Sequence, residues 1–309
     1  MTVKLRTTEP GDRRPDLVDW DGLLREPDVQ ILIELALRED IGATDVTTVA
    51  IFDAAQQVRA AIVTRSETVV CGLPLAESIF QRVDNSIAFT AVIGEGSPAK
   101  AGTILAELSG DVRGLLTAER CALNFLMRLC GIAMAARAAA GAVPDGCRAQ
   151  IYDTRKTTPG WRHLDKAAVR VGGAQNHRFG LYDAVLIKDN HIAAASSVAQ
   201  AVQLAKAYTK RMGHRDMTIE VEIDSLSQLN EALEAEPDII LLDNFDLDDL
   251  RTAVAQAEGR AILEASGGVT LRTIPEVART GVGRISMGAL THTVRPADLS
   301  LEIEQGTTT

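Results

Sequence analysis

Short apolar runs alternate with amphipathic segments throughout the second half of the chain. The runs are residues 149–152, 184–187, 218–223, 238–242, 261–263 and 284–287. Between them, apolar residues recur at the three- and four-residue spacing of helices, over residues 163–174, 196–211, 226–236, 247–258 and 274–280. Repeated units of a strand and then a helix predict a parallel sheet with right-handed crossovers.

The first half of the chain follows a different pattern. One helix is expected at residues 28–39, ahead of Gly42, and a long one at residues 115–140. Short β-like runs lie between them, at residues 58–64, 68–71, 87–92 and 104–108. These elements predict a small α+β domain. The polar residues 1–25 are expected to fray, and we place the domain boundary in the stretch from the long helix to the Gly/Pro break at residues 141–146.

Polar residues or glycines follow or end each of the six runs of the second half. They are Asp153, Arg155 and Lys156; Lys188, Asp189 and Asn190; Glu220, Glu222 and Asp224; Asp243 and Asn244; Glu264, Ser266, Gly267 and Gly268; and Gly288, with the small residue Ala289 after it. In a β/α barrel the carboxyl ends of the strands form one mouth, where active sites lie. The pattern favours a barrel over an open doubly wound sheet. Six clear runs rather than eight predict an incomplete barrel.

Four cations belong to this expected mouth. They are Arg155, Lys156, Arg178 and Lys188, and His177 stands beside Arg178. Arginine binds carboxylate or phosphate through two parallel hydrogen bonds, and lysine acts as a point charge. The set predicts a small substrate with several negative charges. The alternative is that these cations form structural ion pairs with the neighbouring acids Asp153, Asp165, Asp183 and Asp189.

Two acids and two small-residue loops complete the expected mouth. Glu222 and Asp243 lie at neighbouring strand ends, where they could hold ribose hydroxyls or Mg²⁺, or form a solvated pair. The loops Ser266–Gly267–Gly268 and Met287–Gly288–Ala289 could bring backbone N–H groups close to a phosphate, although ordinary tight turns contain the same residues. A lysine in a barrel can also form a Schiff base, which keeps Lys156 and Lys188 open to that chemistry.

Composition narrows the class of protein. The 309 residues have a net charge of −10, which argues against a broad nucleic-acid surface. Cys71, Cys121, Cys130 and Cys147 show neither a CxxC pair nor zinc spacing, so reduced and mostly buried thiols are expected. The start of the chain has no secretory apolar segment, and no apolar stretch reaches the ~18 residues that a bilayer span requires. We therefore expect a soluble, cytoplasmic protein with no membrane partner.

Several motifs together resemble those of quinolinate phosphoribosyltransferases. They are TAERCALN at residues 117–124, DTRKTTPG at 153–160, GGAQNHRFGLYDAVLIKDN at 172–190, EVEID at 220–224, LLDN at 241–244, EASGG at 264–268 and MGALTH at 287–292. REDIGATDVTT at residues 38–48 also resembles the family's N-terminal block. The resemblance covers nearly all of the chain beyond about residue 28.

The resemblance implies a fold, an assembly and an activity. The fold is an N-terminal open-faced α/β sandwich (residues 1–130, joined by a tail at 292–309) and an incomplete, about seven-stranded parallel α/β barrel (131–291). The family implies a homodimer in which each sandwich caps the other subunit's barrel mouth. It implies transfer of the phosphoribosyl group of phosphoribosyl pyrophosphate to quinolinate, with decarboxylation and with Mg²⁺ as cofactor. The product, nicotinate mononucleotide, belongs to the de novo branch of NAD biosynthesis.

The resemblance also implies roles for individual residues. Arg155, Arg178, Lys188 and His177 would surround the quinolinate carboxylates, and Arg120 would reach the site of the partner subunit. Lys156 would contact phosphoribosyl pyrophosphate, Glu222 and Asp243 its ribose hydroxyls or Mg²⁺, and the loops at Ser266–Gly267–Gly268 and Met287–Gly288–Ala289 its 5′-phosphate. Thr154 would also bind substrate. The implied catalytic set is Lys156, Lys188, Glu222 and Asp243.

The chain departs from the family pattern in three places. Trp161 follows the PG pair, Ala174 replaces a frequent third glycine, and residues 209–218 form a longer and more basic connection than expected. Three alternatives stay open at this stage: a phosphoribosyltransferase for nicotinate or another aromatic acid, a Schiff-base lyase, and a non-enzymatic anion-binding protein.

Overall fold

The structure is a computed structural model that describes residues 18–304. The chain divides into two compact units, Met1–Cys130 with Ala297–Thr309, and Gly131–Pro296. All of the expected helices and strands, from the helix at residues 28–39 onward, lie in the described part. Of the 25 residues expected to fray, residues 1–17 lie outside it. Trp20–Arg25 instead form helix α1, which Asp19 caps by accepting a hydrogen bond from the backbone N–H of Gly22 at 2.8 Å.

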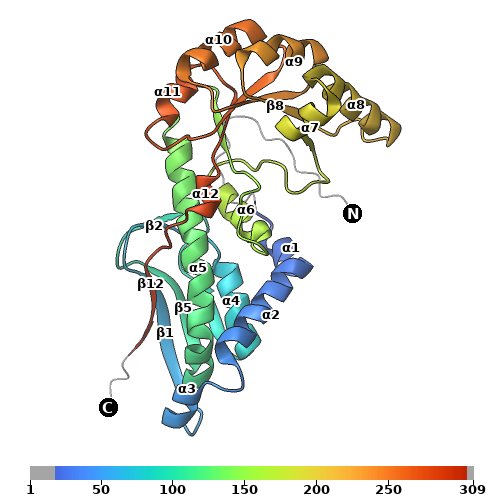
Figure 1. The fold of residues 1–309 in the computed structure, drawn as a ribbon. Helices are drawn as coiled ribbons and strands as arrows, with labels where there is room; N and C mark the ends of the chain where they lie inside the picture. Colours follow the sequence, from blue (N-terminus) through green and yellow to red (C-terminus); the bar gives the residue numbers. More distant parts are fainter. Residues whose placement is uncertain (1–17, 305–309) are drawn as a thin grey trace. The chain divides into compact units, whose positions relative to one another are not determined.

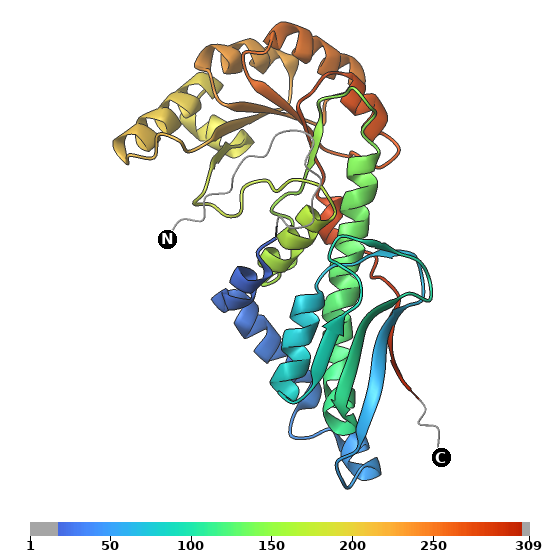
Figure 2. The same ribbon diagram turned by 180° about the vertical axis from the view of Figure 1, so that it is seen from behind.

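The first unit contains an antiparallel sheet of four strands in the order β12-β1-β5-β3. These are β1 (Gln57–Thr64), β3 (Ala88–Ala91), β5 (Ile104–Asp111) and β12 (Leu299–Ile303); β2 (Thr68–Val69) and β4 (Pro98–Ala99) form a separate pair. The helices are α2 (Pro27–Ile41), α3 (Val46–Ile51), α4 (Leu73–Val83) and the first part of α5 (Val112–Gly141), which lies against one face of the sheet (Figures 1 and 2). This is the α+β arrangement that the sequence predicted.

Helix α4 is an element that the sequence reading passed over. Its buried residues Leu73, Leu75, Ala76, Ile79 and Phe80 follow helical spacing. They lie directly after the apolar run at residues 68–71, which hid the start of the helix.

Helix α5 is 30 residues long and apolar enough, by length and composition, to cross a membrane. The expectation that no segment passes that test is therefore wrong. Within the structure 61% of its most apolar window is buried, which is the burial of a core helix. All four cysteines are unpaired, and Cys71, Cys121 and Cys130 are buried.

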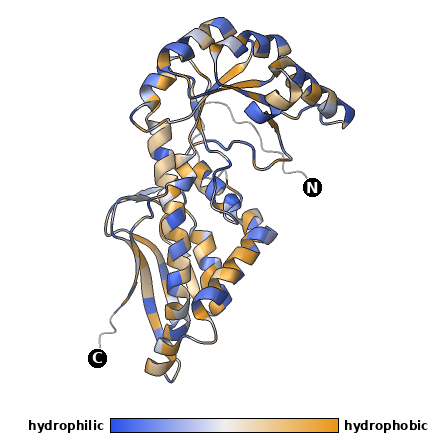
Figure 3. Cartoon of the chain, in the orientation of Figure 1, coloured by the Kyte–Doolittle hydropathy of each residue, from blue (hydrophilic) through white to orange (hydrophobic). Residues whose placement is uncertain are grey.

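The second unit contains a parallel sheet of six strands in the order β6-β11-β10-β9-β8-β7. The strands are β6 (Gln150–Tyr152), β7 (Val185–Ile187), β8 (Ile219–Ile223), β9 (Ile239–Asp243), β10 (Ile262–Ser266) and β11 (Arg284–Ser286). Each of the six runs of the sequence became one of these strands. Figure 3 shows hydrophobic residues in this sheet, and the apolar residues Ile239–Leu242 of β9 are all buried, as in a central strand of a parallel sheet.

Helices connect the strands of this sheet, and a short one, α12, follows its last strand. They are α6 (Arg162–Val171), α7 (Asp189–Ala195), α8 (Val198–Arg211), the 3₁₀ turn Leu226–Gln228, α9 (Leu229–Ala235), α10 (Leu247–Ala257), α11 (Ile274–Arg279) and α12 (Ala289–His292). Helices α8 to α11 follow one another along one face of the sheet (Figures 1 and 2). Helix α8 contains Lys210 and Arg211, so the unusually basic connection is partly a helix end rather than a long loop.

The described sheet has six strands where about seven were expected. Between β6 and β7, only Gln175 forms a parallel bridge with Tyr152. Its N–H donates to Ile151 (2.7 Å) and its carbonyl accepts from Asp153 (3.0 Å). Two residues further on, the N–H of His177 donates to the Asp153 side chain instead of a strand backbone (2.7 Å). The expected seventh strand is thus reduced to one bridge.

Candidate active site

The strand register places the chemistry-bearing side chains on one face of the parallel sheet. Leu186 pairs with Glu220, Glu222 with Leu241, Glu264 with Leu241, and Ser266 with Asp243. Because side chains alternate between faces along a strand, Lys188, Glu222, Asp243 and Ser266 emerge on the same side, at the carboxyl ends of neighbouring strands. The sequence prediction that these residues meet is confirmed by this register.

Lys188 and Glu222 form an ion pair across β7 and β8. The Nζ of Lys188 donates a hydrogen bond to Oε2 of Glu222. The side chain of Lys188 is 45% exposed and that of Glu222 is 16% exposed, so the ammonium group faces both the acid and solvent. A Schiff-base lysine needs a desolvated, neutral amine. This pairing favours a charged Lys188 that binds anions.

Arg155 and Arg178 carry the strongest sign of an anion site. The Nε atom of each is buried and has no hydrogen-bond partner among residues 18–304, which the structure describes. Nη1 of Arg178 donates to the carbonyl of Ala184 (3.2 Å), and burial and then the charge of Arg155 lower the pKa of Arg178. Two neighbouring guanidinium groups with unmatched donors need an anionic partner, because a buried donor without a partner costs about 1–3 kcal/mol. The alternative of structural ion pairs therefore does not account for these two arginines.

Asp153 organises the residues around these arginines. Its Oδ1 accepts hydrogen bonds from Nζ of Lys166 (2.6 Å) and from the backbone N–H of His177 (2.7 Å). Lys166 also donates to the carbonyl of His177 (2.9 Å). The sequence reading treated Asp153 as a possible partner of the mouth cations and missed Lys166 on α6 altogether. Its place in the buried face of an amphipathic helix was the available signal.

Below the mouth, Glu220 of β8 and Glu264 of β10 each lie two residues before the residue of the same strand that reaches the mouth. His177 lies close to both of these acids. Nε2 of His177 lies 3.0 Å from Oε2 of Glu220 and 3.6 Å from Oε1 of Glu264. Burial lowers the pKa of His177, but the hydrogen bond and charge of Glu220 and the charge of Glu264 together raise it. Burial, and then the charge of Glu220, raise the pKa of Glu264 to about 7. Nδ1 of His177 accepts the backbone N–H of Arg178 (2.8 Å).

This geometry places His177 differently from the ligand role that the resemblance implied. Both ring nitrogens already contact protein groups, one on Glu220 and one on Arg178. An imidazole whose Nδ1 accepts a hydrogen bond carries its proton on Nε2. In this arrangement His177 fixes the backbone of Arg178. A direct contact with substrate stays a prediction.

The two small-residue loops follow β10 and β11. Gly267 and Gly268 have positive φ angles of 92° and 60°, which only glycine adopts readily. A Cβ atom on Gly288 would lie 3.0 Å from Cδ of Lys156, so Lys156 lies beside the second loop. The hydroxyl of Thr154 accepts the N–H of Lys156 (3.1 Å) and shapes the turn that carries it. Met287 donates its N–H to Tyr152 (2.9 Å), and the exposed Ala289 opens α12.

Arg120 lies in the first unit, on α5. It is 57% exposed and lies 3.7 Å from Glu119. Two of the departures from the family pattern lie near the ends of α6, in the second unit. Trp161 occupies the N-cap position of α6 without a side-chain capping hydrogen bond, and Ala174 is buried.

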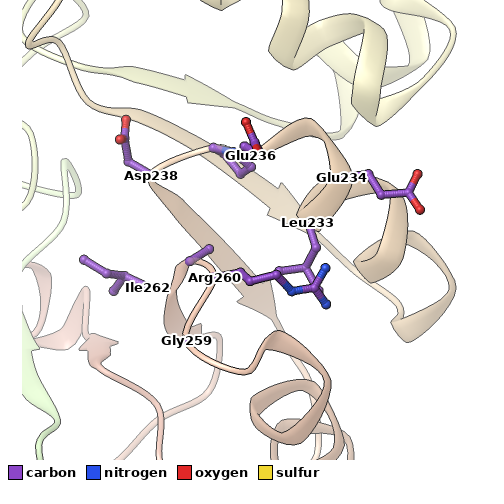
Figure 4. A pocket seen from close by; sticks show the side chains of 9 residues that line it. Leu233, Glu234, Glu236, Asp238, Gly259, Arg260 and Ile262 are labelled. Carbon is purple, nitrogen blue, oxygen red and sulfur yellow. The ribbon is translucent and has the colours of Figure 1, made fainter.

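A cavity of about 620 Å³ lies away from these residues, at the amino ends of β9 and β10 (Figure 4). Its walls include Glu234, Glu236, Asp238 and Arg260. A second cavity of about 260 Å³ borders Ser266, Gly267 and Gly268. Barrel chemistry takes place at the carboxyl ends of strands, so the site is assigned by its side chains rather than by the hollow at the amino ends.

The fold and site together define a class of protein: an α/β-barrel protein whose strand ends form a cationic mouth for a small anionic substrate. Comparison with known proteins narrows the class. Residues 45–130 match "Quinolinate phosphoribosyl transferase, N-terminal domain" and residues 132–302 match "Quinolinate phosphoribosyl transferase, C-terminal domain". The chain belongs to the quinolinate phosphoribosyltransferase family.

Individual relatives agree with this assignment. The chain is 42% identical over 265 residues to a probable nicotinate-nucleotide pyrophosphorylase [carboxylating] of Bacillus subtilis, covering 86% of this chain and 90% of that one. It is 41% identical to the Mycobacterium leprae enzyme of the same name, covering 88% and 95%. The solved nicotinate-nucleotide pyrophosphorylase of Francisella tularensis superposes with a TM-score of 0.85 at 37% identity, covering 91% and 99%.

Proposed function

We propose that this chain catalyses the reaction for which its family is named. It transfers the phosphoribosyl group of phosphoribosyl pyrophosphate to quinolinate and releases pyrophosphate and carbon dioxide. The product is nicotinate mononucleotide, a precursor of NAD. Family membership over nearly the whole chain and the cationic mouth of the barrel support this proposal.

The observation that carries the proposal is the pair of buried, unmatched Nε atoms of Arg155 and Arg178. Quinolinate has two adjacent carboxylates, and each guanidinium can bind one of them through two hydrogen bonds. Lys188 adds a third positive charge on the same side of the sheet. A monocarboxylate such as nicotinate would leave one of these cations without a partner.

The phosphoribosyl side of the site uses the other residues. Lys156 lies beside the loop Met287–Gly288–Ala289, and this loop and Ser266–Gly267–Gly268 offer backbone N–H groups to the 5′-phosphate. Glu222 and Asp243 accept hydrogen bonds from the ribose hydroxyls.

Glu222 and Asp243 also fit Mg²⁺, which prefers oxygen ligands and keeps substrate phosphates in its coordination shell. One oxygen of Glu222 is already taken by Lys188, so most ligands would come from pyrophosphate and water. When bound, Mg²⁺ neutralises the charge of the departing pyrophosphate.

The chain's residues then position and stabilise a substitution at C1′. The lone pair of the pyridine nitrogen forms the new N–C1′ bond while the bond from C1′ to pyrophosphate breaks. C1′ becomes positively charged in the transition state, and Glu222 stabilises it electrostatically. Arg155 and Arg178 hold the ring at the distance and angle that the attack requires.

Decarboxylation follows from the charge of the new ring nitrogen. The C–C bond to the 2-carboxylate breaks, carbon dioxide leaves, and its electron pair stays on C2 beside the positive nitrogen. A proton from solvent then adds to C2. No strong base is needed. The hydrogen bonds that the arginines donate to the remaining carboxylate keep the ring in place during this step.

Assembly and location belong to the same proposal. A homodimer would let the exposed Arg120 of one subunit reach the quinolinate site of the other. We expect this chain to work in the cytoplasm, although an Arabidopsis thaliana relative is named chloroplastic.

The direct test is turnover of purified protein with phosphoribosyl pyrophosphate, Mg²⁺ and either quinolinate or nicotinate. Nicotinate mononucleotide from quinolinate alone is the expected result. Product from nicotinate alone would overturn the dicarboxylate site but keep the phosphoribosyl site. Borohydride trapping on Lys156 or Lys188 would instead support the Schiff-base lyase, which the ion pair of Lys188 disfavours.

A further inference from the structure

Asn244 contacts both of the groups that we assign to phosphoribosyl pyrophosphate at the ends of β9 and β10, the Asp243 carboxylate and the Ser266–Gly268 turn. It directly follows Asp243 at the end of β9, and its backbone N–H donates to the carbonyl of Ser266 at the end of β10 (2.9 Å). Its side-chain Nδ2 donates to Oδ2 of Asp243 (2.8 Å). One residue thus contacts both the acid and the glycine turn.

The backbone of Asn244 is also unusual. Its φ angle is 59°, in the left-handed region, where a non-glycine residue is uncommon. Asn is among the residues that tolerate this conformation best. The conformation turns the amide of Asn244 back onto its own neighbour, Asp243.

Gly267 shows how closely Asn244 packs onto the turn. A Cβ atom on Gly267 would lie 2.1 Å from Oδ1, 2.7 Å from Cγ and 2.9 Å from the backbone nitrogen of Asn244. The positive φ of Gly267 (92°) and this close approach both require glycine. The Asn244 side chain therefore lies directly on the backbone of the turn.

We infer that Asn244 is a positioning residue for phosphoribosyl pyrophosphate. It orients the Asp243 carboxylate for the ribose or Mg²⁺ and sets the place of the Ser266–Gly268 turn relative to that carboxylate. The inference rests on the proposed function, because it assigns these two groups to one substrate. It requires Asn244 to affect phosphoribosyl pyrophosphate and leave quinolinate unaffected, since the quinolinate cations lie in the segments that flank β6 and β7, not beside β9 or β10.

Three variants separate the effect of the Asn244 side-chain hydrogen bond from the effect of its left-handed backbone conformation. Asn244→Gly keeps the left-handed backbone accessible and removes the hydrogen bond to Asp243. Asn244→Asp also tolerates that backbone but places a second carboxylate against Asp243. Glu258→Gly is the matched control: Glu258 has a φ of 49°, ends α10, and lies outside the proposed site.

Binding without turnover gives the first readout. By isothermal titration with Mg²⁺, the Kd for phosphoribosyl pyrophosphate should rise about tenfold in Asn244→Gly, the loss of one hydrogen bond to a charged group. It should rise further in Asn244→Asp and stay unchanged in Glu258→Gly. The Kd for quinolinate should stay within about threefold of wild type in all three. Unchanged phosphoribosyl pyrophosphate binding in Asn244→Gly, or equal loss for both ligands, would overturn the inference.

A double-variant cycle tests the coupling to the turn. Gly267→Ala should weaken phosphoribosyl pyrophosphate binding strongly in the wild-type chain and less in Asn244→Gly, where Oδ1 and Cγ are gone while the positive φ of residue 267 and the contact with the backbone nitrogen of residue 244 remain. Independent losses in the two backgrounds would contradict the coupling. If the proposed function itself were wrong, the wild-type chain would fail to bind phosphoribosyl pyrophosphate, so the two failures are distinguishable.

Discussion

Nζ of Lys166 lies 2.6 Å from Oδ1 of Asp153, and both side chains are almost completely buried. Burial raises the pKa of Asp153 and lowers that of Lys166, and each charge opposes that shift in the other. The pair also holds the backbone of His177 from both sides, through its N–H and its carbonyl. The ion pair therefore connects β6, α6 and the segment that carries Arg178.

Lys166→Met tests how much this ion pair stabilises the folded state, because it leaves a buried carboxylate without its cation. We expect the free energy of unfolding in urea to fall by about 3 kcal/mol, and Asp153→Asn combined with Lys166→Met to recover part of the loss. Arg251→Met is the control, since it breaks an exposed pair with Asp248 and should cost under about 1 kcal/mol. Equal losses at the two sites would contradict the structural role of Lys166.

Arg178→Ala should weaken quinolinate binding far more than phosphoribosyl pyrophosphate binding. Loss of two charge-assisted hydrogen bonds predicts roughly a 100-fold rise in the Kd for quinolinate and little change for phosphoribosyl pyrophosphate. Equilibrium binding of each ligand alone measures this. Equal loss for both ligands would remove Arg178 from the dicarboxylate site.

Mixed subunits test whether Arg120 acts in the partner's site. Arg120→Ala and Arg178→Ala chains, each inactive alone, are unfolded, mixed and refolded together. If Arg120 acts across a homodimer, half of the dimers are mixed and each has one intact site, so activity should return to about a quarter of wild type. Mixtures that stay inactive while forming dimers would show that Arg120 acts within its own chain or not at all.

Glu95 gives the first unit a pH-dependent stability. Its carboxylate accepts the N–H groups of Gly72 and Leu73 at 2.8 Å each, at the start of α4. Burial raises the pKa of Glu95 to about 7, more than these hydrogen bonds lower it. Cys71 and Cys130 are the other titratable groups near it, and both thiols are buried.

The sign of the effect follows from the raised pKa. The folded state holds a proton that the unfolded state loses above pH 4.5, so this contribution is present below pH 4.5 and is lost as the pH rises to about 7. We expect the difference in unfolding free energy between Glu95→Gln and wild type to change by on the order of 3 kcal/mol over that range. Urea denaturation at several pH values measures it. A difference that stays constant with pH would contradict the raised pKa.

The local patterns of the sequence predicted most of this structure. Each apolar run after residue 148 became a strand, because a strand needs only a few consecutive residues of the right kind. The same logic placed Lys188, Glu222, Asp243 and Ser266 together at strand ends.

Other features depended on contacts between distant residues. Lys166 is paired with a residue 13 positions away, and Asn244 packs on a glycine that follows the next strand. His177 lies close to acids on two strands, Glu220 of β8 and Glu264 of β10. Single-sequence patterns carry no information on such pairings, so Lys166 looked like an ordinary polar position, and the protein partners of Asn244 and His177 were not predicted.

The most direct test of the central claim follows the carboxylate that leaves. The protein would be given phosphoribosyl pyrophosphate, Mg²⁺ and quinolinate labelled with ¹³C in its 2-carboxylate. The account predicts labelled carbon dioxide and pyrophosphate in equal amounts, neither of them with nicotinate, and none after chelation of Mg²⁺. Pyrophosphate release without labelled carbon dioxide, or equal turnover of nicotinate, would contradict a decarboxylating transfer to a dicarboxylate.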